Sequence, residues 1–178
     1  LHAYPELSMQ EEKTIAFIKK ELNKMGVPYE IVPNGGIIGK IVGTHPGKTL
    51  ILRADIDALP IQEAKENLRG EKVVVSKIAG VSHTCGHDAH SAMLLGVAQI
   101  LRNLTHHLHG TVLLVFERGE EIGGGIRALM ERLIAIGADG VWGIHVKNDL
   151  PSGKISVDAG PRMAAPMPFA VELIGKSG

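Results

Sequence analysis

The stretch TLILRADID, which runs from Thr49 to Asp57, indicates both the fold of this chain and the place where its chemistry gathers. Its first part, TLILRA, has the compact apolar pattern of a buried strand. The strand continues directly into Asp55 and Asp57, whose spacing puts both side chains on one face of an extended chain. We therefore expect a buried strand with two carboxylates at its carboxyl end, which either bind a metal or hold ligand histidines by hydrogen bonds.

Helices and strands alternate on both sides of this strand. Ser8 and Glu11 have the spacing of a capping box at the start of a helix, and Gly26 suits its C-terminal end. Such alternation is typical of an α/β fold, in which helices flank a mostly parallel or mixed sheet. We predict helices over residues 8–26, 90–104 and 126–137, and strands over residues 28–33, 35–43, 110–116, 140–146, 153–160 and 168–175.

Length and composition exclude several classes of function. The 178 residues, 44% of them hydrophobic, are enough for one globular domain with a core. Lys+Arg and Asp+Glu both number 19, so the zero net charge gives no support for nucleic acid or an anionic membrane as a partner. No apolar run approaches the ~20 residues that span a bilayer. The single cysteine cannot form an intramolecular disulfide, which fits a cytoplasmic protein.

The segment HTCGHDAH, residues 83–90, concentrates ligand chemistry at the start of a predicted helix. The glycine between Cys85 and His87 lets these two side chains curl around one ion, so we predict that both bind metal. His83 and His90 have two readings: each is either a further ligand, or a hydrogen-bond partner or helix cap beside the site.

Two other predicted strands end in metal-binding side chains. Glu120 and Glu121 follow the apolar run GTVLLVF and precede a glycine-rich turn, and His145 ends the run GVWGIHV. The carboxyl ends of strands in an open α/β sheet meet at one crevice. We therefore expect these groups to converge with residues 83–90, with one glutamate facing the metal and the other facing the attacking water.

Other polar side chains receive readings that do not need a metal. Asp88 either caps the helix that follows it or orients a ligand histidine. His106, His107 and His109 lie in a polar turn between a helix and a strand, and we interpret them as surface histidines. The sequence GIIGKIVG lacks the G-x-G-x-x-G spacing of a dinucleotide-binding loop.

Five ordered motifs resemble the aminoacylase/carboxypeptidase-type metallopeptidase family: LHAYPELS, RADIDALPI, HTCGHDAHSAMLLG, GEE with its glycine run, and GIHVKNDLPSGKISVDAGPRMAA. Within that family the chain is most similar to the amidohydrolase branch, which includes hippurate hydrolases, auxin-conjugate hydrolases and N-acetyl-diaminopimelate deacetylases. The resemblance implies a zinc-peptidase-like catalytic domain over residues 1–166. It also implies that residues 167–178 begin an inserted lid or dimerisation domain, so that the chain is the N-terminal portion of a longer protein.

The resemblance further implies a binuclear metal-dependent amidohydrolase that cleaves the amide bond of N-acyl amino acids. It implies that Cys85, His87, Glu121 and His145 are metal ligands and that Glu120 is the general base. Family members use a further histidine ligand near their C-terminus, which this chain does not contain. We expect two divalent ions, zinc or manganese, with cobalt as an alternative. A homodimer of the full-length protein is compatible with this expectation.

Two alternatives to this function stay open at the level of sequence. The first is an incomplete and inactive fragment of such an enzyme. The second is a hydrolase with Cys85 as nucleophile, which would survive chelation but leaves the paired glutamates and His145 unexplained. The chain also departs from the family where Gln-Pro usually precedes the paired glutamates. It has Glu117 and Arg118 there, and the added charge could alter the turn or the substrate preference.

Overall fold

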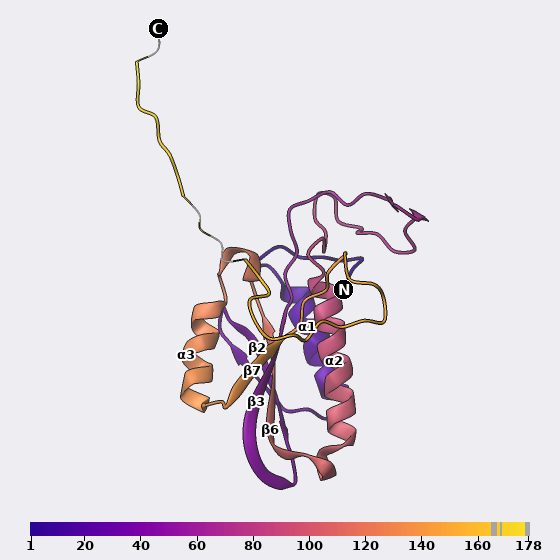
Figure 1. Ribbon diagram of the computed structural model, residues 1–178, viewed down its shortest axis with the longest axis vertical. Coiled ribbons are helices and arrows are strands. Elements are labelled where there is room, and N and C mark those ends of the chain that lie inside the picture. The colour runs from indigo at the N-terminus through magenta and orange to yellow at the C-terminus, as the bar shows by residue number, and fades with distance from the viewer. Residues whose placement is uncertain (165–166, 168, 177–178) are drawn as a thin grey trace. The chain divides into compact units, whose positions relative to one another are not determined.

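The computed structural model describes residues 1–164, 167 and 169–176, which fall into two units (Figure 1). The first unit spans Leu1–Val146 and the second spans Lys147–Gly178. Within the described residues, every helix and strand belongs to the first unit, and the second contains turns and extended chain. The predicted domain boundary between residues 166 and 167 stays a prediction.

One mixed sheet of five strands forms the centre of the first unit, in the order β1-β2-β6-β3-β7. The last three strands in this order run parallel to one another, whereas β2 is antiparallel to both of its neighbours. The prediction of a parallel or mixed sheet is therefore confirmed. The strand bounds are Tyr29–Val32 for β1, Gly36–Val42 for β2, His45–Asp55 for β3, His109–Glu117 for β6 and Gly140–Gly143 for β7.

Helices cover both faces of this sheet, as the alternating side chains of the strands require. Helices α1 (Glu12–Lys24) and α2 (His87–Asn103) pack on one face, and α3 (Ile126–Ile136) packs on the other (Figure 1). Short 3-10 turns η1 and η2 span Thr105–His107 and Glu120–Ile122, and the pair β4 (Glu66–Asn67) and β5 (Gly70–Glu71) forms a small separate hairpin. Consecutive residues of β6 divide between the two cores: Leu114 and Phe116 pack under α1 and α2, whereas Leu113 and Val115 pack under α3.

The register of the parallel strands brings their carboxyl ends to one edge of the sheet. Asp55, the last residue of β3, pairs with Glu117, the last residue of β6. On the other side of β3, Arg53 pairs with Gly143, the last residue of β7. The polar segments after these three strands, and the start of α2, therefore meet in one place.

Several sequence predictions of local structure are wrong. Ser8 and Glu11 form no capping box: α1 begins at Glu12, and neither side chain caps it. Instead, Ser8 donates to Asp57, and Glu11 accepts hydrogen bonds from the backbone of Met9 and Gly119. No strand forms over residues 153–160, or over residues 169–175 of the predicted strand 168–175, since a strand needs a pairing partner and these residues have none in the described chain.

None of the helices in the described part of the chain combines the length and the apolar character that a membrane crossing needs.

Candidate metal centre

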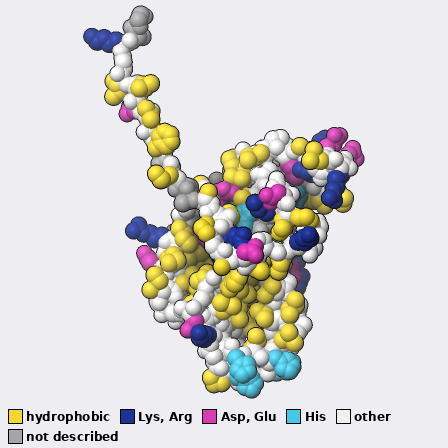
Figure 2. Space-filling view, in the orientation of Figure 1, with side chains coloured by type: hydrophobic (Ala, Val, Ile, Leu, Met, Phe, Trp, Pro, Cys, Tyr) yellow, Lys and Arg dark blue, Asp and Glu magenta, His cyan; other side chains and the backbone are white. Residues whose placement is uncertain are grey.

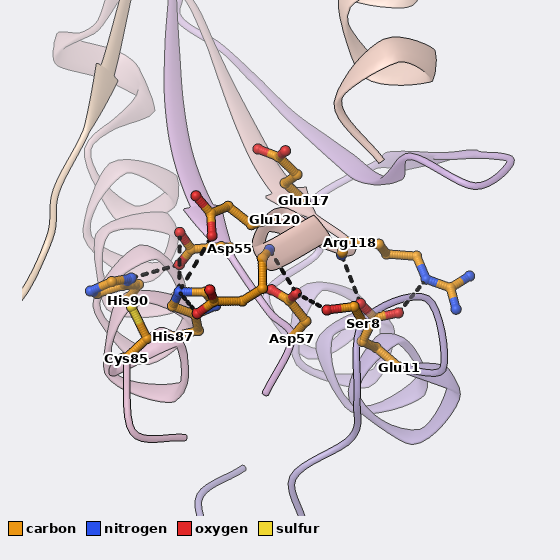
Figure 3. Close-up of polar contacts among 12 residues, drawn as sticks. Ser8, Glu11, Asp55, Asp57, Cys85, His87, His90, Glu117, Arg118 and Glu120 are labelled. Carbon is orange, nitrogen blue, oxygen red and sulfur yellow. Dashed lines mark hydrogen bonds and ion pairs between the residues drawn. The ribbon is translucent and has the colours of Figure 1, made fainter. Parts of the chain in front are cut away.

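The imidazole of His87 lies at the centre of the site, in the first turn of α2 (Figure 3). It is 1% exposed, and its Nδ1 lies 3.0 Å from an oxygen of Asp57. A carboxylate can only accept, so Nδ1 carries the proton and the lone pair of Nε2 faces away from Asp57. Burial would lower the pKa of His87, but the hydrogen bond that its Nδ1–H donates to Asp57 and the charge of Asp55 outweigh it and raise that pKa.

Asp57 is itself held by three donors. Besides His87, its carboxylate accepts the Ser8 hydroxyl at 2.6 Å and the Glu121 backbone N–H at 3.1 Å. The side chain is 1% exposed. Burial would raise the pKa of Asp57, but these hydrogen bonds lower it, so the carboxylate stays ionised. Asp57 therefore fixes both the His87 ring and the turn that carries the paired glutamates.

Asp55 plays the same part for a second histidine. Its carboxylate lies 2.6 Å from Nδ1 of His90 and 2.8 Å from the guanidinium of Arg53, which also contacts Glu117 at 2.7 Å. Burial would raise the pKa of Asp55, but the His90 hydrogen bond and the Arg53 charge lower it to about 2. Of the two readings of Asp55 and Asp57, the structure favours carboxylates that hold histidines.

The side chains of Cys85 and His145 lie close together although they are 60 positions apart in the sequence. Cys85 Sγ lies 3.5 Å from Nε2 of His145, whose Nδ1 lies 2.7 Å from the carbonyl oxygen of Val146. Burial, with the charge of nearby Glu121, raises the pKa of Cys85 to about 12. A thiol with such a pKa is protonated at neutral pH, so a bound cation is the partner that would make it a thiolate ligand.

The paired glutamates follow β6 on the turn η2, and their carboxylates differ in exposure. Glu121 Oε1 is buried 3.6 Å from His87 Nε2, whereas Glu120 Oε2 lies 4.0 Å from that nitrogen on a side chain that is 40% exposed. Burial and the charge of Asp55 raise the pKa of Glu120. The position of Glu121 thus suits a metal ligand, whereas Glu120 is accessible to water or to a substrate.

These side chains form the groups that could hold a metal ion. Ligand atoms come within 4.8 Å of one another in three sets: Cys85 with His87 and His145, His87 with Glu120 and Glu121, and Asp55 with His87 and His90. In the third set His90 has no free nitrogen, because both of its ring nitrogens already have hydrogen-bond partners. In the first two sets, His87 Nε2 and Glu121 Oε1 are buried without any partner.

Buried polar atoms without a partner are costly and call for an explanation. The separation of 3.6 Å between His87 Nε2 and Glu121 Oε1 is compatible with bonds of about 2.0–2.2 Å from each atom to one ion. The donor set of one thiol, two imidazoles and two carboxylates also suits a divalent transition metal. The residues present therefore fit a metal centre.

A second network, which sequence reasoning missed, holds the turn that carries the glutamates (Figure 3). Glu11 is fully buried and accepts the N–H of Gly119 at 2.8 Å, while its other oxygen accepts from Arg118 at 2.8 Å. The two charges that depart from the family pattern are thus both paired, Glu117 with Arg53 and Arg118 with Glu11. A buried partner 107 positions away leaves no local pattern in the sequence.

The remaining predicted histidines lie outside these sets. His83 is buried with no hydrogen-bond partner on either ring nitrogen, and it joins none of the metal-binding groups of the described residues. Asp88 does not cap α2, but lies 2.7 Å from Nδ1 of His2. His106, His107 and His109 are exposed, as predicted, and histidine side chains gather at the lower end of the molecule in Figure 2.

Comparisons with known proteins find relatives that match the whole chain. The model of the family described as peptidase family M20/M25/M40 matches residues 51–174. An N-acyl-L-amino acid amidohydrolase from Geobacillus stearothermophilus is 41% identical over the whole chain, which covers 47% of that protein. An N-acetylcysteine deacetylase from Bacillus subtilis is also 41% identical, with 46% of its length covered, and an IAA-amino acid hydrolase from Arabidopsis thaliana is 40% identical, with 39% covered.

A solved structure gives the same result for the fold. The Bacillus subtilis YXEP protein, described as a dinuclear metal binding peptidase from the M20 family, superposes with a TM-score of 0.81 at 41% identity. The match covers 90% of this chain and 44% of the other. The chain therefore spans less than half the length of these relatives.

Proposed function

The chain belongs to peptidase family M20/M25/M40, and from this premise we propose that it carries the metal centre of an amidohydrolase that cleaves N-acyl amino acids. One observation carries the proposal: His87 Nε2 and Glu121 Oε1 face each other, buried and unpartnered, beside Cys85 and His145. The names of the relatives add the substrate class, because they include an N-acyl-L-amino acid amidohydrolase and an N-acetylcysteine deacetylase.

In this proposal Cys85, His87, Glu121 and His145 hold two divalent ions, as the description of the YXEP protein suggests. Zinc suits the thiolate and the imidazoles, and manganese or cobalt suits the carboxylates equally well. His87 offers a single free nitrogen, since Asp57 occupies the other, so it can bind only one of the ions. Asp57 keeps the proton on Nδ1 and thereby keeps the Nε2 lone pair free for the ion.

Glu120 is the general base of the proposed reaction. Bound metal ions would supply acidification of a water and polarisation of the amide carbonyl. The Glu120 carboxylate takes a proton from the attacking water and passes it to the amide nitrogen, so that a carboxylate and a free amine leave. The raised pKa of Glu120 suits a group that must accept a proton and then release it. Its exposure leaves room for a substrate to approach.

The alternative of a cysteine nucleophile is disfavoured by the surroundings of Cys85. A nucleophilic cysteine needs a lowered thiol pKa. Here burial and the charge of Glu121 raise the pKa of Cys85 to about 12. A cytoplasmic location, supported by the single cysteine, and a homodimer of the full-length protein remain proposals of the same kind.

Conservative substitution of the two glutamates tests the proposal. We expect Glu120→Gln to retain bound metal and to lose the release of free amine from N-acetyl amino acids, because only the base is lost. Glu121→Gln should lose metal as well, since a neutral amide is a poor ligand. Glu131→Gln, an exposed residue of α3, is the matched control. Full turnover in Glu120→Gln would exclude it as the base, and bound metal without turnover in the unsubstituted chain would identify an inactive fragment.

A further inference from the structure

His90 is the third histidine of the cluster, and the proposed ligand set does not use it. It is fully buried, and both of its ring nitrogens have partners. Nδ1 lies 2.6 Å from Asp55, and Nε2 accepts the backbone N–H of Val146 at 3.0 Å. A nitrogen that accepts from an amide cannot also donate an electron pair to a metal, so His90 has another role.

The partners of His90 fix its tautomer. Because the Asp55 carboxylate accepts and the Val146 amide donates, the ring is neutral, with its proton on Nδ1. Asp55 is in turn anchored by Arg53, which also contacts Glu117. The acceptor nitrogen of His90 is therefore aimed at Val146 by a hydrogen bond to Asp55 and by the ion pairs that connect Asp55 through Arg53 to Glu117, the last residue of β6.

Val146 lies beside the other residues of the site. Its side chain packs so closely on Gly86 that a Cβ at Gly86 would overlap it, and Gly86 has a φ of +88°, which favours glycine. The residue before Val146 is His145, whose Nδ1 lies 2.7 Å from the Val146 carbonyl and whose Nε2 lies 3.5 Å from Cys85 Sγ. The strand β7 has already ended at Gly143, so strand pairing does not hold this segment.

We propose that His90 is a positioning residue for His145. By accepting the Val146 N–H, it fixes the chain beyond β7 so that Nε2 of His145 faces Cys85. The inference rests on the proposed role of His145 as a metal ligand, but the hydrogen bond itself can be tested without metal. Cys85 and His145 thus come together because α2, which begins beside Cys85, also carries His90, which accepts a hydrogen bond from the backbone next to His145.

Two amide substitutions at His90 test its hydrogen bonds to Asp55 and to Val146 separately. Asn in place of His90 offers a donor near the position of Nδ1, which preserves the Asp55 contact and removes the acceptor for Val146. Gln places its carbonyl oxygen near the position of Nε2, which preserves the Val146 acceptor and weakens the Asp55 contact. A role in positioning His145 predicts that His90→Asn is the more damaging change for metal binding. A role confined to holding Asp55 predicts the reverse order.

The first test uses the unsubstituted, metal-free chain labelled with ¹⁵N. We expect a scalar coupling between the Val146 amide nitrogen and Nε2 of His90, together with slow hydrogen exchange at Val146. In His90→Asn, exchange at Val146 should accelerate by about tenfold, the value of one lost hydrogen bond, and in His90→Gln it should not. If the unsubstituted chain shows no such coupling and His90 carries its proton on Nε2, the proposal is overturned.

The second test is titration with Co²⁺, whose spectrum reports its ligands. We expect His90→Asn to weaken Co²⁺ binding by about 10- to 100-fold, and His90→Gln to stay within about threefold of the unsubstituted chain. His109→Asn, which changes an exposed histidine at the start of β6, is the matched control. Equal affinities for the Asn and Gln variants would overturn the positioning role. If the unsubstituted chain binds no Co²⁺, the proposed function fails for this chain, while the exchange data still decide whether the Val146 contact exists.

Discussion

Replacing Asp57 with Asn should weaken metal binding without unfolding the chain. The amide oxygen of Asn can still accept from the Ser8 hydroxyl and from the Glu121 N–H, both of which contact the same Asp57 oxygen. The amide NH₂ then faces His87 Nδ1, where the other oxygen accepts at 3.0 Å. To accept from this NH₂, His87 must move its proton to Nε2, which removes the lone pair aimed at the site.

The magnitude follows from the cost of restoring the binding tautomer. With the proton back on Nδ1, two donors face each other, and a charge-assisted hydrogen bond worth about 1.5–3 kcal/mol is lost. Because about 1.4 kcal/mol corresponds to a tenfold change, metal affinity should fall by about 10- to 100-fold. The stability of the metal-free chain should change less, since two of the three hydrogen bonds to the side chain survive.

Competition between the chain and a chromophoric zinc chelator measures this affinity, and urea unfolding of the metal-free chain measures its stability. Asp88→Asn is the matched control, because Asp88 also contacts a histidine nitrogen, at 2.7 Å, but that histidine is His2, outside the metal-binding groups. Its affinity should stay within about threefold of the unsubstituted chain. An Asp57→Asn chain that binds zinc as tightly as the unsubstituted one would show that Asp57 does not set the tautomer of His87.

Three further predictions follow from other contacts. Asp55 has a folded pKa of about 2 against an unfolded value of 3.8, so its contribution of about 2 kcal/mol is present above pH 3.8 and lost as the pH falls through 2, which urea unfolding across this range measures. Zinc binding near pH 7.5 should release about one more proton in the unsubstituted chain than in Cys85→Ser, because the Cys85 thiol is protonated, and calorimetry in buffers of different ionisation enthalpy counts these protons. Arg118→Met leaves Glu11 buried without its cation, and chemical denaturation should show a loss of about 3 kcal/mol.

The fold was largely predictable because its determinants are local. Apolar runs such as GTVLLVF give buried strands, and the order of strands and helices gives an α/β sheet with polar segments at one edge. The prediction failed for residues 153–160 and 169–175, whose patterns suit a strand but which have no partner among the described residues. A strand is stabilised by its neighbour, and the pattern of one segment carries no information about that neighbour.

The sequence predicted which side chains come together at this edge of the sheet, but not the hydrogen bonds that the buried histidines make. His87 and His90 lie three residues apart in one segment; the sequence predicted a metal ligand at His87 but left two readings of His90. The difference lies in the second nitrogen: that of His87 is unpartnered, whereas that of His90 accepts from Val146, 56 positions away. Ser8 shows the same limit. A serine at this position fits a capping box and a hydrogen bond to Asp57 equally well, and the sequence does not say which of the two forms.

The most direct test of the central claim is the metal content of this chain. The purified chain would be loaded with zinc, manganese or cobalt, dialysed, and measured by elemental mass spectrometry beside a Cys85→Ala, His87→Ala variant. We predict about two ions per unsubstituted chain and a clear loss in the variant. Metal content no higher in the unsubstituted chain than in the variant would contradict the assignment of these residues as a metal centre.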